Sequence, residues 1–498
     1  MSLNLQQTAL GAADPQSDPT AIQAALEDTQ GNILKSHGRD NSIHLFLSFT
    51  GAPSDVLSWM RIVGAQHVTS AWQQQLDAQA HRETGADAGP FVNLCLSAAG
   101  YRVLGLTSVM PDDTSFLGGA KNAASGLCDP PPDRWEAGFR SEIHALLIVA
   151  SNDAADTEVA AGTIRAALVD VADVVNEEVG AAMRVNRDGQ VTTDGTGMVH
   201  EHFGFADGVS QPLFYASDIE AERLNSGGFD NYDPSAPLDL VLLKDPGGGP
   251  NGFGTYFVYR KLGQNVINFH TDEANLAKAL VQATRGDDAE PTEAEQKLAS
   301  AYIVGRFRDG TPVVAQAVDG WLNEPNNFNF DADADGMKCP FHAHARKMNP
   351  RGDKVRQFTS PPGEDRARRI ARRAVSFGPL TLDPTPEDQV GLLFICAQSS
   401  IIDQFEFMQS TWANFTDFLR PGTGLDPISG EAPPEQPPVP QQWPREYGSY
   451  NSLSFRDGAP VVQSPYIPYT FTEWVTMLGG EYFFVPSLSF LTSAGATA

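Results

Sequence analysis

Cysteine is scarce in this sequence, and the few cysteines are scattered along the chain. None of the four belongs to a CxxC pair, so the spacing excludes a zinc ribbon and provides no disulfide framework. Such a pattern is more typical of a reducing compartment than of a secreted domain. The cysteines are Cys95, Cys128, Cys339 and Cys396.

Positive charge is also scarce, because 34 Lys and Arg residues stand against 62 Asp and Glu, for a net charge of −28. This balance argues against nucleic acid or an anionic membrane surface as the natural partner. The longest apolar runs, such as 145–150 and 391–396, are far too short for a bilayer span. The N-terminal stretch has neither the basic nor the apolar region of a signal peptide. We therefore expect a cytoplasmic protein without nucleic-acid or membrane partners; composition does not indicate its oligomeric state.

What the sequence does have is 41% hydrophobic residues over 498 positions, enough for a large core and for two or three domains. In the first half, apolar stretches that predict strands alternate with stretches of helical spacing, and the strand faces are half polar. This pattern favours an α+β architecture in which helices pack on one side of an antiparallel sheet. The strands are expected at 43–51, 90–97 and 142–151, and the helices from a cap at Ser54 or Asp55 and from about Asp156 to Val175.

The second half repeats this alternation, with a boundary placed between residues 220 and 221. Thr292 and Glu295 have the spacing of a capping box, which predicts a helix running to about Phe307. Further strands are expected at 238–245, 254–262 and 391–400, and a further helix at 401–414.

One stretch, DADADGMKCPFHAHARKMNPRGD at 331–353, has three interpretations. As a calcium loop it lacks the bidentate acid at its twelfth position, which is His342, and an ordinary Asp-Gly turn fits its start better. As a zinc site it offers Cys339, His342 and His344, but no second cluster supplies the remaining ligands. The third interpretation is that one histidine binds haem iron.

The third interpretation gains weight because this stretch resembles the proximal segment of dye-decolorizing peroxidases, in particular the fungal-type members. The segment EHFGFADGVSQP (201–212) contains that family's G-x-x-D-G signature, and RRIARRAVSFGP (368–379) resembles its distal-arginine segment. Any one motif is weak, since G-x-x-D-G alone is a common turn, but three in the family's order are specific. QGNIL (30–34), YFVYRKL (256–262) and GGEYFFVPSLS (479–489) fit as well, so the resemblance covers nearly the whole chain.

The resemblance implies two ferredoxin-like domains. The N-terminal one, at 1–220, carries the GFADG segment, and the C-terminal one, at 221–498, is the main binding domain for haem b. It further implies oxidation of dyes, phenols or other aromatic reductants by hydrogen peroxide through a ferryl intermediate. An alternative of another class is a haem-handling protein with little peroxidase turnover.

On the proximal side, the resemblance implies that His344 is the axial iron ligand. Its other ring nitrogen should donate to a carboxylate, which fixes the tautomer, and Asp426 is the candidate. Asp426 has a second interpretation as a turn aspartate before Pro427. His342 is expected to face solvent or the haem propionates.

On the distal side, the resemblance implies that Asp207 moves the peroxide proton and that Arg372 stabilises the developing negative charge. A carboxylate in this role is expected to weight the rate towards acid pH. Most of the neighbouring arginines are expected to be solvated or paired with carboxylates. They are Arg366, Arg368, Arg369 and Arg373.

Four further residues are candidates for the haem pocket. Arg346 and Arg351 are plausible partners of the haem propionates, because a buried carboxylate needs cationic donors; the alternative is a surface arginine. Leu392 and Phe394 alternate on one strand and resemble the apolar pair of the distal pocket, although plain core residues would show the same pattern.

Overall fold

The computed structural model describes residues 3–11, 19–320, 326–361, 363–433, 435–449, 453–456, 459–462 and 464–494. Within these ranges, the first half supplies four strands and two connecting helices in a βαββαβ succession, which is the ferredoxin-like arrangement. Its strands pair antiparallel in the order β4-β1-β3-β2. The elements are β1 (Asn41–Phe49), α2 (Pro53–Gln66), β2 (Phe91–Ser97), β3 (Ala145–Ser151), α8 (Ala154–Ala166) and β4 (Ala172–Ala181).

The second half has the same plan, with its strands in the order β17-β9-β12-β11. If the strands of each half are numbered along the chain, both halves therefore show the order 4-1-3-2. The elements are β9 (Phe253–Gln264), α10 (Val266–Arg285), α11 (Glu293–Val304), β11 (Val375–Phe377), β12 (Gly391–Gln398), the helical turns η5 (Ile401–Glu406) and η6 (Met408–Ala413), and β17 (Val475–Val485). The α+β fold with two ferredoxin-like halves is thus confirmed.

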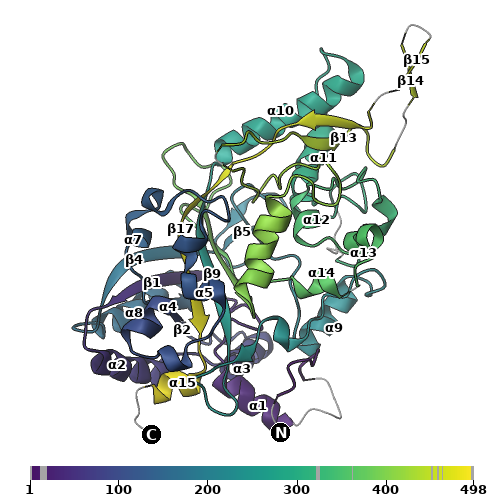
Figure 1. The fold of residues 1–498 in the computed structure, drawn as a ribbon. Helices are drawn as coiled ribbons and strands as arrows, with labels where there is room; N and C mark the ends of the chain where they lie inside the picture. The colour runs from purple at the N-terminus through teal and green to yellow at the C-terminus, as the bar shows by residue number, and fades with distance from the viewer. Residues whose placement is uncertain are drawn as a thin grey trace.

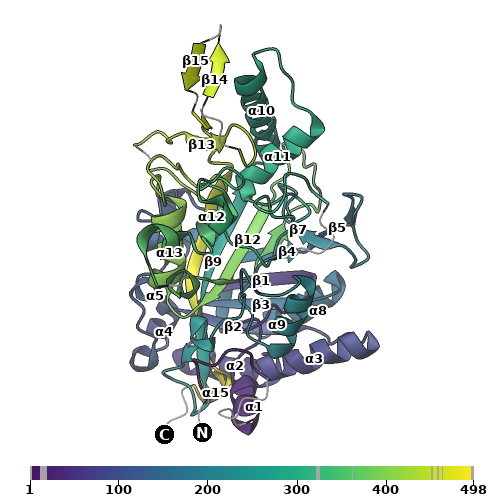
Figure 2. The ribbon, with the colours of Figure 1, turned by 90° about the vertical axis from the view of Figure 1, so that its right-hand side faces the viewer.

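The two sheets join edge to edge into one closed barrel. β17 pairs with β2, and β11 pairs with β4, so each half completes the edge of the other. Closure removes the exposed edges that two separate sheets would leave. The long strands β9 and β12 run side by side through the molecule (Figure 2), and Phe394 lies opposite Arg260 in their register. The predicted boundary at 220/221 lies inside α9 (Ala216–Asn225), between the barrel strands β4 and β9, and stays a prediction.

Smaller elements surround the barrel. Figure 1 shows α1 and α15 at one end of the molecule, and α10 with β13 at the other. Among the described residues, no helix has the length and apolar character that crossing a bilayer requires. The remaining helices are α1 (Pro19–Asp28), α3 (Ala71–Thr84), α4 (Ala98–Val103), α5 (Thr114–Gly118), α6 (Ala120–Ala123), α7 (Ala137–Arg140), α12 (His344–Met348), α13 (Asp353–Phe358), α14 (Glu364–Ala367) and α15 (Leu488–Ser493), with 3-10 turns η1 (Thr107–Val109), η2 (Pro132–Arg134), η3 (Leu238–Leu240) and η4 (Asp331–Asp333). The remaining strands are β5 (Met183–Val185), β6 (Val191–Thr192), β7 (Met198–His200), β8 (Leu243–Lys244), β10 (Ala371–Arg372), β13 (Gln441–Pro444), β14 (Leu453–Arg456), β15 (Ala459–Val462) and β16 (Tyr466–Tyr469).

Several local predictions are confirmed and others are wrong. The capping box of Thr292 and Glu295 is present at the start of α11. The predicted helix to Val175 is wrong, because α8 ends at Ala166 and the next residues form β4. The predicted strand at 238–245 is wrong over most of its length. Leu238–Leu240 form the turn η3, whose leucines are buried by packing, and Leu243–Lys244 form the short strand β8, which pairs with β9.

Two helices also differ in detail from the sequence prediction. The N-cap of α2 is Ala52, with Pro53 at the first helical position, so neither Ser54 nor Asp55 caps it. The predicted helix at 401–414 is helical, but η5 and η6 have π-helical hydrogen bonding. Such wide turns are rare and occur mostly at functional sites.

Candidate active site

A cavity of about 310 Å³ lies against the outer face of β12, β9 and β17. Side chains that alternate along these strands form one wall, because every second residue of a strand points to the same face. The helical turns η5 and η6 and helix α12 supply further lining residues. The strand residues that line the cavity are Leu392, Phe394, Arg260, Leu262, Gln264, Val475 and Met477. Leu392 and Phe394 therefore line the cavity, and their role in a haem pocket stays a prediction.

His344 begins helix α12 and lines the cavity. Its Nδ1 lies 2.9 Å from Oδ2 of Asp426, which is fully buried. A carboxylate only accepts, so Nδ1 carries the proton and Nε2 is left with its lone pair. The other carboxylate oxygen of Asp426 accepts the backbone N–H groups of Ile428 and Ser429 at 2.8 and 3.0 Å. The predicted hydrogen bond between His344 and Asp426 is thus present in the structure.

Burial alone would raise the pKa of Asp426. The positive charge that His344 has when its ring is protonated, and the hydrogen bonds from His344, Ser429 and Ile428, together outweigh burial, so the pKa of Asp426 lies below its usual value. The carboxylate is therefore held ionised beside the imidazole.

Asp207 and Arg372 form an ion pair at the same cavity, with Arg372 Nη1 donating to Asp207 Oδ1 at 2.9 Å. The turn that presents Asp207 has Gly204 and Gly208 at φ of 90° and 74°, a region that favours glycine. The backbone N–H of Arg372 donates to Oε1 of Gln211 at 3.0 Å. Among the described contacts, Oδ2 of Asp207 has no partner.

The expectation for the arginines around Arg372 is wrong for two of them. Arg369 and Arg373 are buried, and their guanidinium groups donate mainly to backbone carbonyl oxygens. Arg373 donates to the carbonyls of Asn32 and Ile33, away from Asp207, so Arg372 is the arginine of this segment that reaches the aspartate.

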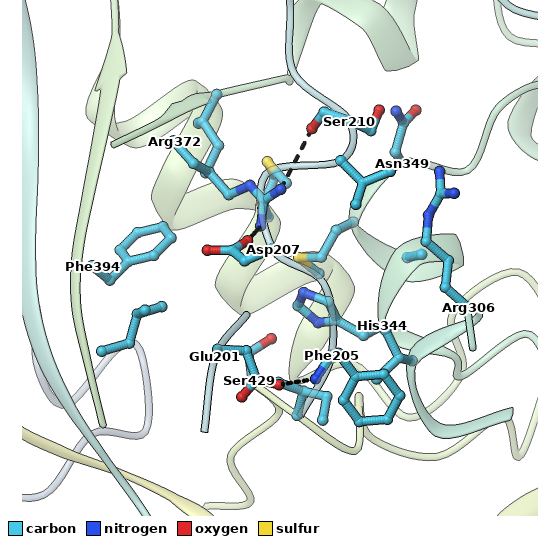
Figure 3. A pocket seen from close by; sticks show the side chains of 18 of the residues that line it. Glu201, Phe205, Asp207, Ser210, Arg306, His344, Asn349, Arg372, Phe394 and Ser429 are labelled. Carbon is cyan, nitrogen blue, oxygen red and sulfur yellow. Dashed lines mark hydrogen bonds and ion pairs between the residues drawn. The ribbon is translucent and has the colours of Figure 1, made fainter. Parts of the chain in front are cut away.

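One edge of the cavity is cationic. Arg351 lies with its guanidinium 3.9 and 4.0 Å from the ring centroids of Tyr232 and Phe328, and donates to Oγ of Ser210 at 3.1 Å. Arg306, which the sequence did not indicate, also lines the cavity. Figure 3 shows Arg306 and Asn349 along this edge, Phe394 across from them, and the Asp207–Arg372 pair and His344 projecting inward from different segments.

Arg346 does not belong to this edge, and its prediction as a propionate partner is corrected. Its side chain is 0% exposed, does not line the cavity, and donates to Asp353 Oδ2 at 2.7 Å and Asp333 Oδ2 at 2.8 Å. Two buried carboxylates therefore satisfy the guanidinium, in a place that a bound group does not reach.

Two further carboxyl groups, which are partly buried, line the cavity although the sequence indicated neither as a site residue. Glu201 accepts the backbone N–H groups of Phe203 and Phe205 at 2.9 Å, and burial raises its pKa. Burial and then the charge of Asp129 raise the pKa of Glu431 to about 8. Both lie in loops that only the tertiary fold brings to the cavity.

The acidic start of the 331–353 stretch forms a turn. Asp333 is buried and accepts the backbone N–H groups of the turn, and Gly336 has φ of 68°, as an ordinary Asp-Gly turn predicts. The described residues contain no group of three or more His, Cys, Asp or Glu arranged to hold a metal ion. The expectation for His342 is wrong, because it is buried against Trp443, with ring centroids 4.2 Å apart.

Three comparisons with known proteins agree with one another. The family model described as "DyP dimeric alpha+beta barrel domain" matches residues 28–184. The multifunctional dye peroxidase DyP2 of an Amycolatopsis species is 38% identical over 94% of this chain and 95% of its own length. The dye-decolorizing peroxidase msp1 of Mycetinis scorodonius is 30% identical over 96% of this chain and 91% of its own length.

Solved structures show the same similarity. A DyP-type peroxidase of an Anabaena species has a TM-score of 0.84 and 41% identity, over 95% of each chain. A dye-decolorizing peroxidase in complex with 2,6-dimethoxyphenol has a TM-score of 0.73 and 25% identity, over 94% of this chain and 99% of its own. The similarity is not confined to the fungal-type members that the motifs resemble.

Proposed function

This chain belongs to the dye-decolorizing peroxidase family, and from that premise we propose that its cavity holds haem b with His344 as the iron ligand and Asp207 and Arg372 as the groups that act on hydrogen peroxide. The family makes the protein an enzyme that oxidises a reducing substrate with hydrogen peroxide. A haem-handling protein with little turnover is therefore the weaker interpretation.

The cavity fits an iron porphyrin. Nε2 of His344 has a free lone pair, because Nδ1 donates to Asp426, and a neutral imidazole is the form that binds iron. Leu392 and Phe394 offer an apolar wall to a flat macrocycle. Arg351 and Arg306 lie at one edge, where the two propionate carboxylates need cationic donors. The Arg346 site takes no part in this binding.

Haem iron, when bound, supplies the redox chemistry of peroxide reduction. The residues of this chain supply the rest. Asp426 keeps His344 in one tautomer and orientation. Oδ2 of Asp207 takes the proton from one peroxide oxygen and returns it to the other, so that the oxygen that leaves does so as water. The guanidinium of Arg372, which donates to Asp207 and to the carbonyl of Ser210, stabilises the negative charge that develops as the O–O bond breaks.

We propose phenols and dyes as the reductants. One similar structure was solved with 2,6-dimethoxyphenol, which fits this class. The cytoplasmic location expected from the sequence stays a proposal of the same kind.

One observation carries the proposal: the hydrogen-bonded pair His344–Asp426 and the ion pair Asp207–Arg372 lie at the same cavity. The test mixes haem-loaded protein with hydrogen peroxide and follows the haem spectrum in stopped flow. We expect Asp207→Asn to slow the spectral change by about 10²–10⁴-fold, the usual contribution of general acid–base catalysis.

The matched control is Asp218→Asn, which removes a carboxylate that pairs with Lys35 away from the cavity and should leave the rate unchanged. An Asp207→Asn rate equal to wild type at full haem occupancy would refute the role of Asp207. Haem binding by His344→Ala with an unaltered Soret band would refute the ligand assignment.

A further inference from the structure

Lys347 is a buried lysine, and none of the ion pairs of the described residues includes it. It lies one helical turn after His344 on α12, and the residue is 0% exposed. Among the described residues, no Asp or Glu oxygen lies within 4 Å of its Nζ. A buried ammonium is costly unless its surroundings compensate, so its position needs a physical reason.

The three N–H donors of Lys347 bind three backbone carbonyl oxygens instead. Nζ lies 3.2 Å from Ala413 O, 3.0 Å from Phe415 O and 2.7 Å from Gly424 O. Ala413 is the last residue of η6 and Phe415 lies two residues after it, whereas Gly424 belongs to the loop that carries Asp426. One ammonium therefore joins two segments of chain that are separate in sequence.

The loop is held at the same place by a second contact. The backbone N–H of Asp426 donates to Ala413 O at 2.9 Å, the carbonyl that Lys347 also binds. On the other side, a Cβ on Gly424 would lie 2.8 Å from the Gln441 side chain, so the loop is closely packed from both directions. Helix α12 thus binds this loop twice, through His344 at Asp426 and through Lys347 at Gly424.

We propose that Lys347 is the positioning residue of the His344–Asp426 pair: its ammonium fixes the 424–426 loop and places a positive charge behind the carboxylate that accepts the His344 proton. This inference rests on the proposed role of His344 as iron ligand. The cost of the arrangement is visible in Lys347 itself, since burial lowers its pKa to about 7 although the charge of Asp426 opposes the shift.

Two substitutions separate the hydrogen bonds of Lys347 to the three carbonyls from its positive charge. Lys347→Met removes both, whereas Lys347→Gln removes the charge and keeps two of the three N–H donors on a shorter side chain. The control is Lys354→Met on α13, whose ammonium pairs with Glu364 and Asp365. All variants are made in the full chain.

The first readout uses the protein without haem and measures the Nδ1 proton of His344 by NMR, assigned from its absence in His344→Ala. In Lys347→Met we expect this proton to exchange about tenfold faster and to move upfield, because the acceptor is less well placed. Lys354→Met should leave it unchanged. A purely structural lysine would lower the unfolding midpoint without changing this signal.

The second readout is the midpoint potential of the haem-loaded protein. A displaced acceptor makes the imidazole a poorer electron donor, so the potential should rise in Lys347→Met. Loss of the positive charge with the loop still in place makes Asp426 a stronger acceptor, so the potential should fall in Lys347→Gln. An unchanged Nδ1 signal and potential in both variants would overturn the inference while leaving the proposed function standing. If His344→Ala binds haem as wild type does, the proposed function fails instead. Should Lys347→Met not fold, Lys347→Gln carries the same test.

Discussion

Replacing Arg346 by Met distinguishes a buried ion-pair centre from a haem-binding arginine. Nε and Nη2 of Arg346 donate to the two oxygens of Asp353 at 2.7 and 2.9 Å, and Nη1 donates to Asp333 at 2.8 Å. The planar group also packs 4.4 and 4.3 Å from the ring centroids of Phe330 and Phe341. The substitution keeps most of the side-chain volume but leaves two buried carboxylates without their shared cation.

Removing one partner of a buried ion pair costs about 3–5 kcal/mol of folding free energy. The lower end applies here, because Asp333 keeps three backbone N–H donors and Asp353 keeps its contact with Arg356. We therefore expect Arg346→Met to lower the free energy of unfolding by about 3 kcal/mol.

Urea unfolding of the protein without haem measures this loss directly. The control is Arg285→Met, because Arg285 and its partner Glu295 are 46% and 37% exposed and such a surface ion pair is worth at most about 1 kcal/mol. Adding Asp353→Asn to Arg346→Met should restore part of the stability, since it removes one of the unpaired charges. The reasoning fails if Arg346→Met without haem is as stable as wild type and only haem affinity falls.

Two further predictions concern pH and the distal pair. Burial lowers the pKa of His44, which contacts Tyr259 OH, to about 3, so the unfolded chain binds its proton first as pH falls. Stability should therefore drop below about pH 6.5, by about 2 kcal/mol from His44 at pH 5, and His44→Gln should flatten the urea-unfolding profile; an unchanged profile argues against the assignment. Arg372→Met should lower kcat/KM for hydrogen peroxide by about 10²–10³-fold, and a loss below threefold in steady-state assays would contradict its role.

Sequence motifs were sufficient for the residues whose roles depend on local segments. Asp207 lies in a glycine-bounded turn, and His344 starts a short helix, so a short run of residues sets each position. The capping box at Thr292 was predictable for the same reason. The alternation of strands and helices indicated the α+β class, because period and turn residues are local properties.

Local pattern failed where burial came from distant parts of the chain. Residues 238–242 are as apolar as a strand, yet packing rather than sheet pairing buries the leucines and the valine among them. The closure of two four-stranded sheets into one barrel depends on the β17–β2 and β11–β4 pairs, which join strands of different halves. The hydrophobic periodicity within a strand does not indicate which other strand will pair with its edge.

The arginines show most clearly where sequence ends and tertiary structure begins. Arg346 and Arg351 lie in one motif and looked equivalent as propionate partners. Only Arg351 lines the cavity, because Asp333 and Asp353 capture Arg346. In the same way, Glu201 and Glu431 line the cavity although the sequence indicated neither, even though Glu201 opens the segment that contains Asp207. The sequence by itself determined the family, the fold class and the iron-ligand candidate. Which charged side chain meets which partner was decided by the tertiary structure, because electrostatic contacts act through space and not along the chain.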